Sequence, residues 1–134
     1  MAIAPPSVRT SEDAGAAAVE FVLVGLLLTF LTLGVIQLGV AVYVRNVVHD
    51  AAAEGAHRGA LADASPAEGA QRTRELIGRA VGESFAQEVS AQRSGELGYP
   101  TVRVTVRARL PLVGLLGPAA GMEVQAHAPL ESFD

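Results

Sequence analysis

The sequence predicts a membrane-anchored α+β protein. A long N-terminal transmembrane helix is expected to extend into a small domain with a second helix and a C-terminal antiparallel β-hairpin. Two observations carry this prediction. The first is a run of 24 residues without a formal charge, from Phe21 to Val44. The second is a pair of segments near the C-terminus, residues 101–110 and 122–130, in which apolar and other side chains alternate. The long run predicts a membrane helix, and the alternation predicts half-buried strands.

The apolar run is long enough to cross a bilayer. At about 1.5 Å per residue it spans about 36 Å as a helix, against a hydrocarbon core of about 30 Å. We predict a helix over residues 16–44 that continues through residues 45–60 into water. Glu54 and Arg58 stand four residues apart, in the order that favours an ion pair along a helix. The sequence therefore predicts one helix with a membrane half and an aqueous half.

Small residues form a ridge on the aqueous part of this helix. Ala51, Gly55 and Gly59 recur every four residues, so they fall on one helical face and allow another helix to approach closely. The partner is expected to be the next helix of the same chain rather than a second subunit. That helix is predicted to open with a capping box at residues 65–68, with proline at the first helical position, and to end near Gln92.

The two alternating segments predict a hairpin. Valines occupy one face of the first segment, and arginines and a threonine occupy the other. Leu110 is expected opposite Met122, which places Arg109 against Glu123 across the strands. The intervening stretch, residues 111–121, is apolar without a period. It is expected to cover the hairpin, with a contact site for another protein as the alternative.

Composition argues against several classes of function. Cysteine is absent and the net charge is −4, with ten basic residues that are all arginine and are not clustered as a nucleic-acid site requires. His49, His57 and His127 lack the close grouping of metal ligands. No phosphate-binding loop, zinc-protease motif or nucleophile motif occurs. We therefore expect no catalysis, no cofactor, no metal, no nucleic acid and no small-molecule substrate.

The start of the apolar run resembles the processing site of type IV pilins and pseudopilins. In that motif a glycine at the cut is followed after four residues by glutamate and an aromatic residue. Here Gly15 precedes Ala16, and Glu20 and Phe21 follow at the expected distance. The aromatic residue after the glutamate is most similar to the tight-adherence (Tad) branch. A small-residue stretch at residues 51–58 resembles one found beyond the membrane helix in TadE-like pseudopilins.

This resemblance implies a division of the chain and a set of partners. Residues 1–15 would be a prepilin-type leader, 16–44 the transmembrane helix and 45–134 an extracytoplasmic TadE-like domain. Prepilin peptidase would cut between Gly15 and Ala16. The partners implied are the membrane, the peptidase, other pilins or pseudopilins and the Tad inner-membrane platform. The location implied is the bacterial cytoplasmic membrane, with a single span, or the cell surface in a Tad/Flp pilus.

The resemblance also implies a role for the acid at the membrane edge. In the pilin family the glutamate meets the free N-terminal amine of an adjacent subunit, and Glu20 would take that role here. The other interpretation is that Glu20 only reaches the lipid headgroups as the helix begins. Intramembrane carboxylates are costly unless paired, which favours the pilin-like role.

Other functions remain open from the sequence. An uncleaved single-span anchor with an extracytoplasmic binding domain needs neither Gly15 nor Glu20. Two acids, Glu12 and Asp13, stand where pilin leaders are usually basic, which keeps this alternative open. A membrane-tethered enzyme is disfavoured because no catalytic group of residues is present. A major pilin is disfavoured because Tad major pilins are usually much shorter.

Overall fold

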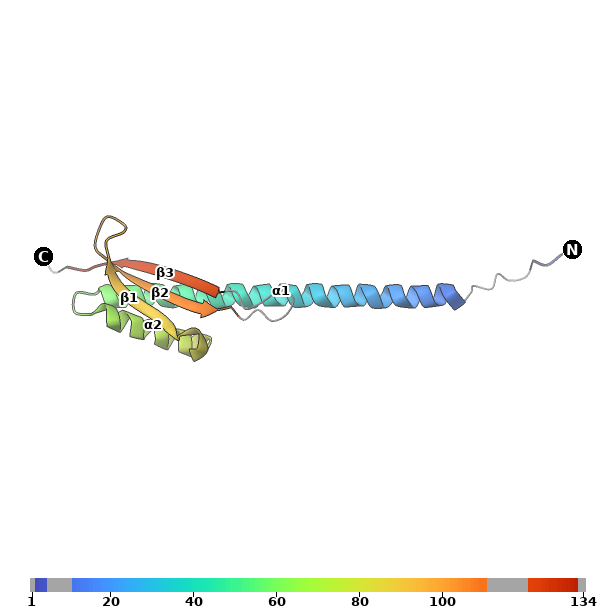
Figure 1. The fold of residues 1–134 in the computed structure, drawn as a ribbon, viewed down its shortest axis with the longest axis horizontal. Coiled ribbons are helices and arrows are strands. Elements are labelled where there is room, and N and C mark those ends of the chain that lie inside the picture. Colours follow the sequence, from blue (N-terminus) through green and yellow to red (C-terminus); the bar gives the residue numbers. More distant parts are fainter. Residues whose placement is uncertain (1, 5–10, 111–120, 133–134) are drawn as a thin grey trace. The chain divides into compact units, whose positions relative to one another are not determined.

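The computed structural model describes residues 2–4, 11–110 and 121–132. It confirms the α+β class, with a long N-terminal apolar helix, a second helix and an antiparallel sheet (Figure 1). The elements are α1 (Ser11–Ala60), α2 (Pro66–Ala80), the 3-10 turn η1 (Glu83–Phe85), β1 (Glu88–Ser94), β2 (Thr101–Arg109) and β3 (Gly121–Pro129). Most of the apolar stretch expected at residues 111–121 lies outside the described residues, as does part of the predicted leader at residues 1–15. The chain divides into two units, residues 1–36 and 37–134.

The first unit contains the first half of α1, and its apolar side chains are exposed on every side of the helix. This helix is long and apolar enough to cross a membrane. The hydroxyls of Thr29 and Thr32 each donate to the carbonyl four residues earlier, at 2.8 Å. These bonds satisfy the two threonine hydroxyls, as a lipid environment requires.

Helix α1 begins five residues earlier than predicted, at Ser11 instead of Ala16. Glu12 and Asp13 stand in its first turn. Carboxylates near a helix N-terminus interact favourably with the unpaired N–H groups and the positive end of the helix dipole. The same acids that are unusual in a pilin leader therefore favour an early start of the helix.

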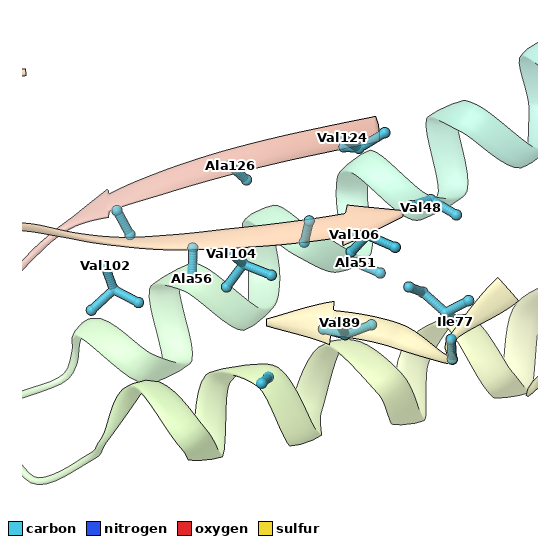
Figure 2. Packing of buried hydrophobic residues seen from close by; sticks show 14 of the residues in the cluster. Val48, Ala51, Ala56, Ile77, Val89, Val102, Val104, Val106, Val124 and Ala126 are labelled. Atoms are coloured by element: carbon cyan, nitrogen blue, oxygen red, sulfur yellow. The ribbon is translucent and has the colours of Figure 1, made fainter. Parts of the chain in front are cut away.

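The second unit packs one antiparallel sheet against two helices. The strand order is β1-β2-β3, and α2 lies along β1 (Figure 1). One face of the sheet is buried and its residues alternate with exposed ones along β2 and β3. The core between helices and sheet is built from alanine, valine and isoleucine side chains (Figure 2); they include Val48, Ala52, Ala56, Ile77, Val89, Val102, Val104, Val106, Val124 and Ala126.

The second helix is shorter than predicted. It ends at Ala80, not near Gln92, and the chain then forms η1 and β1. The backbone leaves the helix at Gly82, whose φ of 111° suits glycine and interrupts a right-handed helix. Val89, which the periodicity placed on the helical stripe, is instead a buried residue of β1. The two predicted strands are therefore β2 and β3 of a three-stranded sheet, in which β1 is the strand that was not predicted.

The predicted register of β2 and β3 is wrong by two residues. The structure pairs Ala108 with Met122 and Arg107 with Glu123, while Arg109 faces Gly121. Side chains alternate with a period of two, so a slip of two residues leaves every side chain on its predicted face. The assignment of faces holds, and only the cross-strand partners change.

The junction between the helices forms as predicted. The Ser65 N–H donates to Glu68 Oε2 at 2.7 Å, and the Glu68 N–H donates to Ser65 Oγ at 3.4 Å. Pro66 is the first residue of α2, so the capping box is confirmed. At the end of α1 the Ala60 carbonyl accepts a hydrogen bond of 2.9 Å from the Glu131 N–H. That bond joins the end of α1 to the segment that follows β3.

Candidate functional site

The candidate cleavage motif lies on α1. Gly15 and Ala16 are both exposed, and a Cβ built on Gly15 would meet no other atom within 4 Å. Nothing in the described part of the chain therefore requires glycine at this position. If glycine is needed there, the requirement comes from a molecule that approaches this backbone closely.

Glu20 and Phe21 are exposed on the same helix. Phe21 is 79% exposed and begins the apolar run. Glu20 follows Ala16 by four residues, so these two side chains lie one turn apart on the same face. The helix therefore places the carboxylate about one turn from the amine that a cut after Gly15 would create.

The small residues of α1 lie against α2. A Cβ added to Gly55 would lie 1.8 Å from Thr73 Oγ1 and 2.6 Å from the Gly69 carbonyl oxygen. A Cβ added to Gly59 would lie 3.3 Å from Gly69 Cα. The two helices therefore touch backbone to backbone at this point, and Ala51, Gly55 and Gly59 are all buried.

The matching residues of α2, Gly69 and Thr73, were not singled out from the sequence. They stand four residues apart, so they form a short ridge of small residues that faces the ridge on α1. Thr73 is fully buried, and its Oγ1 lies 2.9 Å from the Gly69 carbonyl oxygen and 3.4 Å from that of Ala51. The spacing of Gly69 and Thr73 was the signal that could have identified this half of the contact.

The ion pair predicted within α1 does not form. Glu54 Oε1 lies 3.9 Å from Arg72 Nε, and Arg58 lies 4.0 Å from Glu68 Oε1. Glu54 and Arg58 therefore each pair with a residue of α2 instead of with one another. All four side chains are at least 40% exposed, so each pair contributes little to stability.

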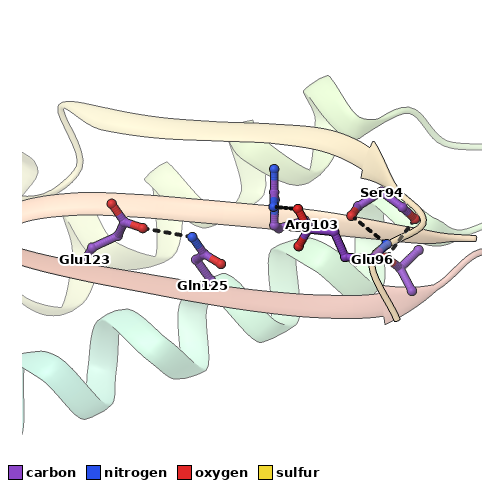
Figure 3. A network of polar contacts seen from close by, with 6 residues as sticks. Ser94, Glu96, Arg103, Glu123 and Gln125 are labelled. Atoms are coloured by element: carbon purple, nitrogen blue, oxygen red, sulfur yellow. Dashed lines mark hydrogen bonds and ion pairs between the residues drawn. The ribbon is translucent and has the colours of Figure 1, made fainter. Parts of the chain in front are cut away.

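The face of the sheet turned away from the helices carries a polar network (Figure 3). Arg107 Nε donates to Glu123 Oε2 at 2.7 Å, and Gln125 Nε2 donates to Glu123 Oε1 at 2.8 Å. Arg103 pairs with Glu96 on the turn between β1 and β2. The hydrogen bond from Arg107, and then that from Gln125, lower the pKa of Glu123. The same bond to Glu123 raises the pKa of Arg107.

Histidine and carboxylate side chains do not gather into a metal-binding group anywhere in residues 2–4, 11–110 and 121–132. The candidate functional features are therefore two: the cleavage motif at the start of the apolar helix, and the contact of Ala51, Gly55 and Gly59 with Gly69 and Thr73, called the α1–α2 seam below.

Comparison with known proteins bears on the same helix. Residues 15–57 match the TadE family, described as TadE-like protein. No curated protein and no solved structure gives a significant match. The matched segment begins at Gly15 and ends at His57, three residues before the end of α1. Proteins of this family are structural and non-enzymatic components associated with a pilus. Over residues 15–57, less than half of its length, the chain is therefore similar to TadE-like proteins.

Proposed function

We propose that this protein is a minor pseudopilin that takes part in assembly of a Tad/Flp type IVb pilus. It is inserted into the membrane as a precursor, and prepilin peptidase removes residues 1–15 by cutting after Gly15. The observation that carries the proposal is the start of the family match at Gly15, the residue that the cleavage motif singles out. The exposure of Gly15 and Ala16 on α1 supports access by a peptidase.

The helix that remains after the cut explains the need for Glu20. Its new N-terminus is the amine of Ala16, followed after four residues by Glu20 and then by the uncharged run from Phe21. A lone carboxylate at the membrane edge is costly, and a positively charged amine offsets that cost. In the assembled state Glu20 pairs with the Ala16 amine of an adjacent subunit, and before assembly the amine of the same chain lies one turn away.

The remaining parts of the proposal follow from this arrangement. Residues 16–44 form the transmembrane helix, and residues 45–134 form an extracytoplasmic domain, with the leader in the cytoplasm where the peptidase cuts. The protein catalyses nothing; it is the substrate of the peptidase. Its partners are other pilins or pseudopilins and the Tad inner-membrane platform, and it stays in the cytoplasmic membrane or leaves it within a pilus.

The test is the intact mass of the membrane-extracted protein from cells with and without the cognate prepilin peptidase. We expect the mass of residues 16–134 when the peptidase is present and the full-length mass when it is absent. A Gly15→Val variant, whose Cβ has no atom of the described chain within 4 Å, should keep the full-length mass in both strains. Full-length protein in both strains without the substitution would refute processing.

One observation favours a second function, that of an uncleaved anchor. Helix α1 begins at Ser11, so the Gly15–Ala16 bond lies within helical backbone and the leader merges with the membrane helix. In that case the domain beyond the membrane would bind an envelope component, and Gly15 and Glu20 would be dispensable. The intact mass separates the two functions, because only the pseudopilin loses residues 1–15.

A further inference from the structure

The apolar run does not end where the packed domain begins. Ala41 and Val44 are buried within the second unit, at 7% and 4% exposure, whereas Val42 and Tyr43 beside them are exposed. A hydrocarbon core needs about 20 helical residues, and the run from Phe21 holds four more. The last turn of the run therefore has two different sides: one is buried in the second unit, and the other is apolar and exposed.

The sheet extends to the level of this last turn. Strands β2 and β3 run along α1 (Figure 1); a Cβ on Gly59 would lie 3.3 Å from Val102 Cγ1, and Figure 2 shows Val106 beside Ala51. Eight helical residues and four strand residues both cover about 12–13 Å, so the two elements are nearly aligned.

The same arithmetic locates the end of β2. The three residues from Val106 to Arg109 add about 10 Å, which corresponds to six or seven helical residues before Ala51. Arg109, with Gly121 as its partner on β3, is therefore level with Val44 or Arg45 on α1. This end of the second unit is called the basal end below, and it comprises Arg45, Arg107 to Leu110, and Gly121 to Glu123.

The basal end presents two exposed guanidinium groups. Arg45 and Arg109 are exposed, and neither has an ion-pair partner among the described residues. Arg107 is paired with Glu123, and the acid Glu88 stands opposite Arg107 in the β1–β2 register. Guanidinium groups bind phosphate oxygens through bidentate hydrogen bonds. Tyr43 is also exposed, and tyrosine is enriched at membrane interfaces.

We propose that the basal end rests on the bilayer surface, with Arg45 and Arg109 bound to the phosphates of lipid headgroups. This inference rests on the membrane span in the proposed function and adds to it a second, peripheral contact between the domain and the same bilayer. The partner is a phospholipid surface, and anionic lipid strengthens the contact.

The test uses single cysteines, because the chain has none of its own. Gly121→Cys labels the basal end and Gly95→Cys labels the opposite end of the sheet. Both glycines are exposed, neither has a positive φ, and a Cβ at either meets nothing within 4 Å. Gly34→Cys, also free of contacts, reports the apolar run. Each full-length variant is labelled with a fluorophore and reconstituted in phosphatidylcholine vesicles that carry nitroxide on the headgroup or on the acyl chain.

We expect headgroup nitroxide to remove most of the fluorescence at position 121 and little at position 95, which lies about 26 Å away along the sheet. Acyl-chain nitroxide should quench position 34. Equal quenching at positions 121 and 95, with position 34 quenched, overturns the surface contact and leaves the membrane anchor intact. Loss of quenching at position 34 overturns the anchor, and the inference with it.

The role of the arginines is tested with lipid charge. Each arginine near an anionic surface favours the contact by about fivefold. Adding phosphatidylglycerol should therefore increase quenching at position 121, and the Arg45→Gln/Arg109→Gln double variant should lose that increase. The Arg72→Gln/Arg93→Gln variant removes the same charge away from the basal end and should keep it. If phosphatidylglycerol still increases quenching at position 121 in the Arg45→Gln/Arg109→Gln variant, the assignment of phosphate binding to these two arginines is overturned.

Discussion

At the scale of single residues, the close approach of α1 and α2 depends on glycines, which have no side chain to hold the helices apart. Gly55 and Gly69 leave room for backbone atoms of one helix to approach those of the other, and Thr73 fills the space beside them with a buried hydroxyl. A methyl group at Gly55 would collide with both a side-chain oxygen and a backbone oxygen. The side chain can rotate, but the Gly69 carbonyl belongs to the helix, so the helices themselves would have to separate.

This contact predicts opposite effects for two glycine-to-alanine substitutions. Gly55→Ala should destabilise the second unit by about 1–3 kcal/mol, because overpacking a tight contact outweighs the gain in helix propensity. Gly78→Ala, in α2, meets only the flexible Glu83 side chain at 3.4 Å and should stabilise by up to about 1 kcal/mol. Thermal unfolding of the full chain in detergent, followed by circular dichroism, measures both. A Gly55→Ala midpoint at or above the wild-type value would contradict the tight seam.

A second residue-scale prediction concerns pH. The folded-state pKa of Glu123 is lowered, chiefly by the Arg107 hydrogen bond. A lowered folded pKa means that the ionised pair stabilises the fold fully above the ordinary glutamate value of 4.5, and that this contribution is lost as the pH falls through the folded pKa.

The measurement is an NMR titration of the Glu123 side-chain carboxyl carbon. Arg107→Gln should raise the Glu123 pKa toward its ordinary value, because both the charge and the donor are removed. Arg93→Gln, whose side chain is not a cause of the shift, serves as the control and should leave the titration unchanged. An unmoved midpoint in Arg107→Gln would rule out the pair as the cause.

At the scale of elements, the bounds of a helix or strand could be predicted from sequence only where a strong local motif marks them. The capping box at Ser65 fixed the start of α2, because its donors and acceptors are all within four residues. The end of α2 depended on Gly82, which is tolerated in many helices and interrupts this one. The segment Glu88–Ser94 has few β-branched residues, so only pairing with β2 makes it a strand. Its conformation is a tertiary effect that local pattern cannot reveal.

The register of β2 and β3 failed for a related reason. Alternation fixes the face of each side chain, but it is unchanged by a slip of two residues. The stretch between the strands contains no two-residue turn signal that would have fixed the pairing. The candidate site was easier to locate, since its motif and the start of the uncharged run are contiguous in sequence, whereas the α1–α2 seam required matching two distant ridges.

The capping box gives an element-scale prediction. Ser65→Ala should destabilise the second unit by about 1 kcal/mol, because the Glu68 N–H at the start of α2 loses its side-chain acceptor. Ser90→Ala, on the exposed face of β1, is the matched control and should change stability by less than about 0.5 kcal/mol. Chemical denaturation of the detergent-solubilised chain, read through the shift in midpoint, distinguishes them. Equal shifts for the two variants would count against the cap.

At the scale of the whole molecule, one continuous helix belongs to two environments. Residues before Gln37 present apolar side chains in every direction, and residues after it bury one side against α2 and the sheet. The proposed pseudopilin function would use both parts: a stem that packs among other stems, and a domain that distinguishes this subunit from other pilins.

The acid at the head of the stem supplies the prediction at this scale. Glu20→Ala should be processed to the same extent as the wild type but should fail to join the assembly, since the neighbouring amine then lacks its partner. Glu20→Gln should fail as well if charge is what matters. Glu12→Ala is the matched control, because the proposed cleavage after Gly15 would remove the substitution and leave an identical mature chain. Quantitative immunoblotting of sheared pilus fractions and membranes measures incorporation, and normal incorporation of Glu20→Ala would refute the pairing role.

The seam between α1 and the rest of the domain also has a mechanical consequence. The Gly55–Gly69 contact, the Val48 and Ala56 contacts with the sheet and the hydrogen bond from Glu131 to Ala60 are spread along the helix. A pull along the axis of α1 loads them in shear, so they resist together instead of opening one after another. Forced unfolding is governed by the rate of crossing its barrier. We expect this domain to withstand axial tension on its stem better than an equal force applied sideways, which would peel the helix from the sheet.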